Sequence, residues 1–199
     1  MQIQTLKVGQ LRTNCYLVSA DLSLDCLIID PGDDADIISE EIMRQNLEPQ
    51  AIIATHGHYD HVLASRELQL GFEIPFFVRQ ADQFLVDKMK KSAEYWSSRT
   101  IIEEPPKVGR YLEPGQEIEF GQEQLTVFPA PGHTPGGICL YNQEQRIIFS
   151  GDTVFGQGLV GRTDLPYSNP ADLRKTVKTI KSKFEGYDAY PGHGDSFIV

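Results

Sequence analysis

The stretch Thr55-His56-Gly57-His58-Tyr59-Asp60-His61 determines how the rest of this sequence is interpreted. Two imidazoles two residues apart are followed directly by a carboxylate and a third imidazole. Neutral imidazole and carboxylate are common ligands of zinc and similar divalent ions, so this stretch predicts a metal-binding loop. The four preceding residues, 51–54, are all apolar. They favour a short buried strand that ends where the histidine cluster begins.

The chain has only two other histidines, and both stand in turn-rich segments. His133 lies in a Pro-Gly-His-Thr-Pro-Gly-Gly segment, and His193 lies in Pro-Gly-His-Gly-Asp. Asp152 adds a carboxylate directly after the apolar run 147–149 and a Ser-Gly pair. Together with the first cluster these side chains make a set of seven possible metal ligands. Every histidine of the chain belongs to it.

Size and charge limit the classes of function. With 199 residues and 40% hydrophobic residues, the chain is expected to form one domain over 1–199. Its net charge of −10 argues against nucleic acid as a partner, because a phosphate backbone needs a concentrated Lys/Arg face. The start lacks the pattern of a signal peptide, and no run approaches the roughly 20 apolar residues of a membrane span. We therefore expect a cytoplasmic protein without a membrane partner.

The three cysteines predict no disulfide framework. Cys15, Cys26 and Cys139 are odd in number, widely spaced, and set in apolar runs that are typical of strands. Free cysteine is among the most frequently buried residue types. We expect all three to be small core residues.

Hydrophobic periodicity predicts a mixed α/β fold. We expect strands over 3–8, 14–19, 25–29, 51–54, 75–78, 117–120, 124–128, 137–141, 147–149 and 188–190. We expect helices that begin near Asp33 or Asp34, at His61, near Ala81 and after an Asn169 N-cap. Residues 92–115 have a weak pattern and predict a loop or lid. Two β-rich layers with helices outside them make a four-layer α/β/β/α sandwich.

The order and spacing of these motifs resemble those of the metallo-β-lactamase superfamily, over essentially the whole chain. The resemblance implies two divalent metal ions, zinc first, with iron or manganese as the alternatives. It also implies a metal-bridging hydroxide as nucleophile, with Asp60 and Asp152 as the catalytic carboxylates. By the family pattern, His56, His58 and His133 hold one ion, Asp60, His61 and His193 hold the second, and Asp152 bridges both.

Within the superfamily, the sequence is similar to the short bacterial form of the glyoxalase II group, which hydrolyses thioesters of 2-hydroxy acids such as S-lactoylglutathione. Secreted lactamases use a cysteine at the position of Asp152, and this chain has none there. The stretches 151–155 and 161–164 point the same way. Longer glyoxalase II enzymes carry a C-terminal helical domain that binds glutathione. We expect no such domain here, because the chain ends six residues after His193.

Three residues outside the ligand set are candidates for supporting roles. Arg162 is the best-placed residue to bind a charged thiol, although a salt bridge to Asp164 would explain it equally well. The hydroxyl of Tyr59 is expected to meet the substrate, with packing as the alternative. Asp30 matches a recurring aspartate of the superfamily and is expected to orient a metal ligand from behind; capping or turn formation is the alternative.

Other activities of the same superfamily stay open at this point. Persulfide dioxygenases share the Gly-Arg-Thr-Asp element at 161–164 and use a single iron, held by the equivalents of His56, His133 and Asp152. Lactonases keep the whole ligand set. We favour hydrolysis because all ligands of the second metal are present, and we expect the partner to be a small-molecule thioester. The sequence does not indicate the oligomeric state.

Overall fold

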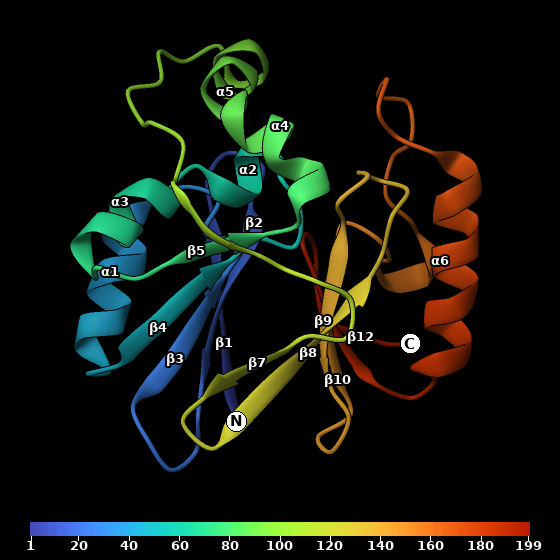
Figure 1. Cartoon of the computed structure of the whole chain (residues 1–199), viewed down its shortest axis with the longest axis horizontal. Coiled ribbons are helices and arrows are strands. Elements are labelled where there is room, and N and C mark those ends of the chain that lie inside the picture. Colours follow the sequence, from blue (N-terminus) through green and yellow to red (C-terminus); the bar gives the residue numbers. More distant parts are fainter.

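The computed structural model describes residues 1–199, and its main feature is a pair of six-stranded sheets, shown in Figure 1. The first sheet contains β1 (Gln2–Val8), β2 (Thr13–Ser19), β3 (Asp25–Ile29), β4 (Glu48–Ile53), β5 (Phe76–Val78) and β6 (Val108–Tyr111), in that spatial order. The second sheet has the order β12-β11-β10-β9-β8-β7. Its strands are β7 (Glu117–Phe120), β8 (Glu123–Pro129), β9 (Ile138–Asn142), β10 (Ile147–Gly151), β11 (Asp188–Pro191) and β12 (Phe197–Ile198).

Helices cover the outer faces of the sheets. In Figure 1, α1 (Ala35–Arg44) and α3 (Ser65–Gly71) lie outside the first sheet, and α6 (Pro170–Lys183) lies outside the second. The shorter α2 (Tyr59–Val62), α4 (Gln83–Asp87) and α5 (Met89–Ser97) gather above one end of the sheets. This arrangement confirms the predicted four-layer α/β/β/α sandwich. None of the helices combines the length and the apolar character of a membrane span.

The layers follow from alternating side chains in the central strands. Successive residues of a strand point to opposite faces. Leu27 and Ile29 of β3 therefore join Phe149 in the core between the sheets, whereas Ile28 joins the core beneath α1 and α3. In β10, Phe149 faces the other sheet and Ile148 faces the core beneath α6. The three cysteines are free and buried in these cores, as predicted.

The strand ends bring the predicted ligand loops to one edge of the sandwich. Parallel pairing of β3 with β4 places Asp30 beside the segment that leads into Thr55, and parallel pairing of β10 with β11 places Asp152 beside Gly192. The amide N–H of Ile138 also donates to the carbonyl of Thr55 across the two sheets, at 2.9 Å. Sites of α/β proteins commonly form past the carboxyl ends of strands, and this one does so twice.

The prediction of a loop or lid over 92–115 was wrong at both of its ends. Helix α5 extends to Ser97, and β6 pairs with β5 as an edge strand. The helix buries little beyond Met89 and Ala93, and most of β6 is exposed, so neither segment carries a clear hydrophobic period. The predicted helix over 81–91 is broken into a 3-10 turn (Gln80–Asp82), α4 and the start of α5.

The predicted helix starts were partly confirmed. Asn169 caps α6 as expected, because its side chain accepts hydrogen bonds from Ala171 and Asp172, and Pro170 occupies the first turn. Asp34 does not cap α1 through its side chain; its carboxylate accepts from the amide of Gly9 instead, at 2.8 Å. His61 lies within α2 rather than at the start of the longer helix, which begins at Ser65.

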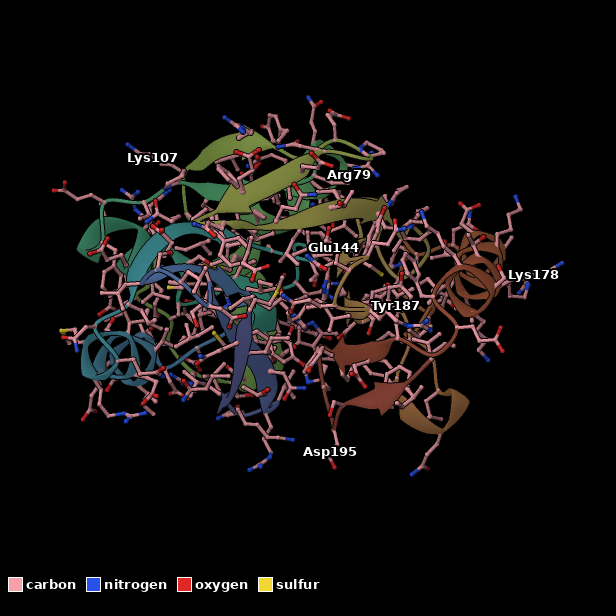
Figure 2. The ribbon with its side chains drawn as sticks, turned by 90° about the horizontal axis from the view of Figure 1, so that it is seen from below. Arg79, Lys107, Glu144, Lys178, Tyr187 and Asp195 are labelled. Atoms are coloured by element: carbon pink, nitrogen blue, oxygen red, sulfur yellow. The ribbon has the colours of Figure 1, made fainter.

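The basic residues of α6 form a solvated helix face. Figure 2, seen from below, shows the side chain of Lys178 projecting outward from this helix. Lys181 and Lys183 stand in its last turn, where cations interact favourably with the helix dipole. This face contributes nothing to the edge that carries the histidines.

Candidate metal centre

The structure brings all seven predicted ligands together at the edge described above. They form three overlapping groups in which one possible ligand atom of each residue lies within 4.8 Å of the others. The groups are His56, His58 and His133; Asp60, His61 and His193; and His56, His61 and Asp152. The first two groups coincide with the two sets of ligands expected from the sequence.

In the first group, three ring nitrogens converge. Nε2 of His56 lies 3.0 Å from Nδ1 of His58, and Nε2 of His133 lies 3.1 Å from the same Nδ1. His58 therefore turns a different nitrogen toward the group than its two neighbours do. Three converging lone pairs are the donor arrangement that a divalent cation requires.

The second group combines one carboxylate with two imidazoles. Oδ2 of Asp60 lies 3.3 Å from Nε2 of His193 and 3.6 Å from Nε2 of His61. The two ring nitrogens are 3.4 Å apart. The hydroxyl of Thr13 donates to the same Asp60 oxygen at 3.4 Å.

Asp152 lies between the two groups. Its Oδ2 is 3.7 Å from Nε2 of His133 and 3.6 Å from Nε2 of His193, and its Oδ1 is 3.5 Å from Nε2 of His61. Oδ1 is fully buried and has no hydrogen-bond partner. A buried carboxylate oxygen without a partner is strongly unfavourable, and a cation at this point removes the penalty. The donor set therefore fits two divalent ions with Asp152 between them.

The second ring nitrogen of each histidine also has a partner, which sets the orientation of the ring. Such outer contacts commonly fix the tautomer of metal-binding histidines. Where the partner is a backbone carbonyl the histidine must donate, so the nitrogen that faces the group keeps its lone pair. The partners are Thr55 Oγ1 for His56, the Tyr167 hydroxyl for His58, Asp30 Oδ2 for His61, the Arg162 carbonyl for His133 and the Leu11 carbonyl for His193.

Asp30 supports one ligand of each group from behind the site. Its buried carboxylate accepts from Nδ1 of His61 at 3.0 Å, from the Thr55 amide at 2.7 Å and from the Thr55 hydroxyl at 2.6 Å. Because the hydroxyl donates to Asp30, its oxygen is free to accept from Nδ1 of His56. Asp30 thus orients one histidine directly and one through Thr55, in the position predicted from the sequence. It caps no helix.

Burial keeps His56 and His58 of the first group neutral. It lowers the pKa of His56 well below the ordinary value, and the nearby rings of His61 and His58 lower it further. Burial likewise lowers the pKa of His58 to about 3, with His133 adding to the effect. Both rings therefore present lone pairs at neutral pH, as metal binding requires.

Nearby carboxylates determine the charge of His61 in the second group. Burial by itself would lower the pKa of His61, but Asp152, Asp60 and Asp30 raise it to about 10. Burial opposes ionisation of Asp60 as well, yet the rings of His61 and His193 hold its pKa below the usual range. Without a metal, protons supply the positive charge that this cluster of carboxylates needs, and a bound cation replaces them.

The sequence did not predict the role of Asp82. Its buried carboxylate accepts from the Gly57 amide at 2.9 Å, the Thr134 hydroxyl at 2.7 Å and the Gly136 amide at 2.6 Å. It therefore joins the loop of His56 and His58 to the loop of His133. An acidic residue at the start of a predicted helix has an ordinary electrostatic explanation, so the sequence carried no separate signal for this role.

The two groups form the floor of a pocket of about 900 Å³. Its sides include Tyr59, an aromatic candidate named from the sequence, together with Trp96 and Tyr167. The Tyr167 hydroxyl lies 2.8 Å from Nε2 of His58, and its ring packs edge-on against Phe84.

Arg162 lies at the pocket and also forms the salt bridge that was the alternative explanation. Its Nε and Nη2 donate to the two carboxylate oxygens of Asp164, each at 2.7 Å. This contact lowers the pKa of Asp164 to about 2. The guanidinium also lies 5.6 Å from the centre of the Trp96 ring.

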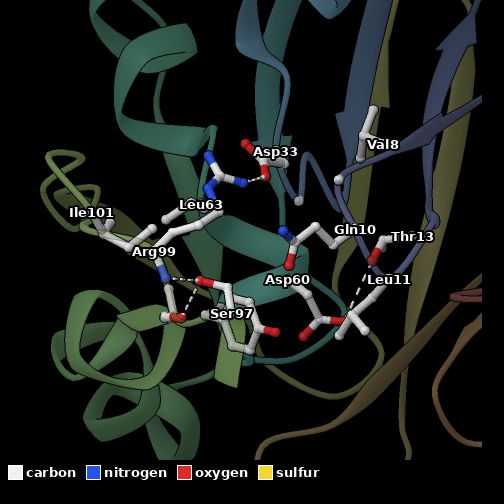
Figure 3. A pocket seen from close by; sticks show the side chains of 14 residues that line it. Val8, Gln10, Leu11, Thr13, Asp33, Asp60, Leu63, Ser97, Arg99 and Ile101 are labelled. Atoms are coloured by element: carbon white, nitrogen blue, oxygen red, sulfur yellow. Dashed lines mark hydrogen bonds and ion pairs between the residues drawn. The ribbon is translucent and has the colours of Figure 1, made fainter. Parts of the chain in front are cut away.

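A smaller cavity lies behind Tyr59 and Asp60 and is shown in Figure 3. Asp33 and Arg99 form an ion pair of 3.1 Å in it, and the contact between Thr13 and Asp60 closes its inner end. Asp60 thus borders both cavities.

Comparison with known proteins defines the class to which this site belongs. Residues 8–193 match the sequence model of the metallo-beta-lactamase superfamily. The chain therefore belongs to this superfamily, and the resemblance found in the sequence is confirmed at that level.

Relatives within the superfamily differ in their described properties. Hydroxyacylglutathione hydrolase GloC of Haemophilus influenzae is 30% identical, with 90% of this chain and 84% of GloC covered. Among solved structures, the B3 metallo-beta-lactamase BLEG-1 has a TM-score of 0.90 at 28% identity, covering 99% of this chain and 94% of BLEG-1. TTHA1623 in a di-iron-bound form has a TM-score of 0.88 at 33% identity, covering 98% and 94%.

Proposed function

We propose that this protein is a metal-dependent hydrolase of the glyoxalase II type, which cleaves thioesters of 2-hydroxy acids. The observation that carries the proposal is the complete second group of ligands, Asp60, His61 and His193, beside the unpartnered oxygen of Asp152. A single-iron dioxygenase needs no such group. The described activity of the Haemophilus relative supports the same reaction type.

The seven side chains would hold two divalent ions, for which we propose zinc. His56, His58 and His133 would bind one ion, Asp60, His61 and His193 the other, and Asp152 both. Bound ions of this kind polarise a carbonyl oxygen and lower the pKa of water, so that hydroxide is available at neutral pH.

The pocket contains neither a cysteine nor a serine paired with a histidine, which supports water as the attacking group. All three cysteines are buried elsewhere, and burial raises the pKa of the Cys139 thiol to about 12. Ser92 is the only serine at the pocket, and its hydroxyl has no histidine partner to activate it.

The remaining residues orient the reactants. Asp60 is placed to accept a hydrogen bond from the attacking water, since Thr13 donates to its Oδ2 and holds the carboxylate in place. The hydroxyls of Tyr59 and Tyr167 stand at the pocket, where they can bind the carbonyl or the 2-hydroxyl group of the acyl part. Trp96 and Leu165 cover the sides and limit the access of bulk water.

Metal analysis combined with a substrate panel tests the proposal. We expect about two zinc-like ions per purified chain and hydrolysis of S-lactoylglutathione, which serves as the reference substrate. One iron per chain with persulfide-dependent oxygen uptake would instead establish a dioxygenase. Cleavage of β-lactams or acyl-homoserine lactones without cleavage of any thioester would contradict the proposal in favour of a lactamase or a lactonase.

A further inference from the structure

Apart from the proposed metal centre on its floor, the pocket offers little positive charge to a substrate. Apart from its histidines, the only cation among the residues that line it is Arg162. Leucine and tryptophan side chains occupy much of the remaining wall, namely Leu11, Leu85, Trp96 and Leu165.

The guanidinium of Arg162 is already paired with a carboxylate of the protein. Its guanidinium binds both oxygens of Asp164 at 2.7 Å, in the bidentate geometry that is strongest for this pair. Both side chains are about half exposed or more, at 51% and 65%, so the pair is weak in absolute terms. However, Asp164 is only two residues away and therefore has a high effective concentration at the guanidinium. A carboxylate of the substrate has to compete with it.

No other lysine or arginine lines the pocket. Arg99, in the neighbouring cavity of Figure 3, is paired with Asp33. The cations of α6 line a separate hollow on the outer face of that helix, together with Val160 and Val177. Glutathione carries two carboxylates, so its thioesters would place at least one of them beside an apolar wall, in a protein with a net charge of −10.

We propose that the thiol part of the preferred substrate is uncharged and partly apolar, and that Asp164 is a specificity-determining residue that weakens binding of anionic thiols. This inference rests on the proposed function and narrows its substrate class. The reaction is unchanged: water adds its oxygen to the acyl carbon, the carbon–sulfur bond breaks, and a proton goes to the departing sulfur. The apolar wall binds the uncharged thiol by excluding water from it.

Two thioesters with the same D-lactoyl group test this proposal. One carries glutathione and the other carries uncharged N-acetylcysteamine, and both are assayed with the zinc-loaded protein. We expect kcat/KM to be at least about fivefold higher for the uncharged thioester, mainly through KM. Equal values, or a preference for the glutathione thioester, would overturn the inference and leave the proposed hydrolase intact. If neither is hydrolysed, the proposed function fails first.

Variants separate the role of Asp164 from general effects. Asp164→Asn frees the guanidinium, so kcat/KM for the glutathione thioester should rise by about threefold, with the uncharged thioester unaffected. Asp172→Asn removes an exposed carboxylate that lies 3.9 Å from Lys175 on α6, and serves as the control. Arg162→Ala should raise KM for the glutathione thioester alone. An Asp164→Asn protein with unchanged selectivity would contradict the assigned role.

Discussion

The carboxylate of Asp82 accepts a hydrogen bond of 2.7 Å from the hydroxyl of Thr134. Asp82 follows β5 of the first sheet, whereas Thr134 lies in the loop between β8 and β9 of the second sheet. The same carboxylate accepts from the amides of Gly57 and Gly136. Both glycines approach so closely that a Cβ on either would meet Asp82 at less than 3 Å. The spacing between the two loops of the first ligand group therefore depends on this one buried side chain.

Replacing Asp82 tests this dependence. Asp82→Ala leaves two buried amides and one hydroxyl without an acceptor, at a cost of about 1–3 kcal/mol each. We expect the free energy of unfolding to fall by at least about 3 kcal/mol. Chemical denaturation measures this change. Asp87→Ala, an exposed position on the same segment, is the control and should change stability by no more than about 0.5 kcal/mol. Similar stability of the two variants would show that Asp82 does not hold the loops together.

Asp152→Ala should abolish hydrolysis and empty both metal positions. Asp152 lies between the two groups, with its carboxylate oxygens 3.5–3.7 Å from ring nitrogens of His61, His133 and His193. Elemental analysis of the purified variant gives the metal content, and thermal unfolding with added zinc gives the stabilisation that binding confers. A variant that retains two ions per chain would refute the bridging position of Asp152.

Tyr167→Phe should weaken metal binding with little effect on folding. The variant keeps the aromatic packing against Phe84 but removes the oxygen that accepts from Nε2 of His58. Loss of such an outer contact commonly lowers metal affinity by about 10-fold or more. Competition with a chromophoric chelator measures the affinity. Tyr59→Phe is the matched control, since its hydroxyl has no partner in the protein, and it should bind zinc as the wild type does. Equal affinities in the two variants would contradict the role of Tyr167.

Gly192→Ala should disturb the centre through sterics alone. A Cβ at this position would lie 2.2 Å from Oδ1 of Asp152 and 2.7 Å from Cε1 of His61. Forced displacement of packed atoms costs about 1–3 kcal/mol, and we expect the metal content to fall as well. Gly71→Ala adds the same methyl group at a position with nothing within 4 Å, and its metal content should stay normal. A fully loaded Gly192→Ala protein would show that the Asp152 side chain can move without loss of the site.

The residues that gather at the site could be predicted from the sequence because the information is local. The cluster from His56 to His61 follows an apolar strand, and His133, Asp152 and His193 each stand at a turn after an apolar segment. Continuous apolar runs in β3 and β10 likewise predicted strands, since both faces of these strands are buried. The end of α5 and the strand β6 were not predicted, because little of their surface is buried and their hydrophobic pattern is therefore weak.

The sequence by itself therefore determined the sandwich, and it predicted which seven histidine and aspartate side chains gather at one edge of it. Only the tertiary structure decided that Asp82 and Tyr167 support the first ligand group. The physical reason is the range of the interactions. Hydrophobic period and ligand spacing act within a few residues of the chain, whereas these hydrogen bonds form only after folding has brought distant loops to one edge of the sheets.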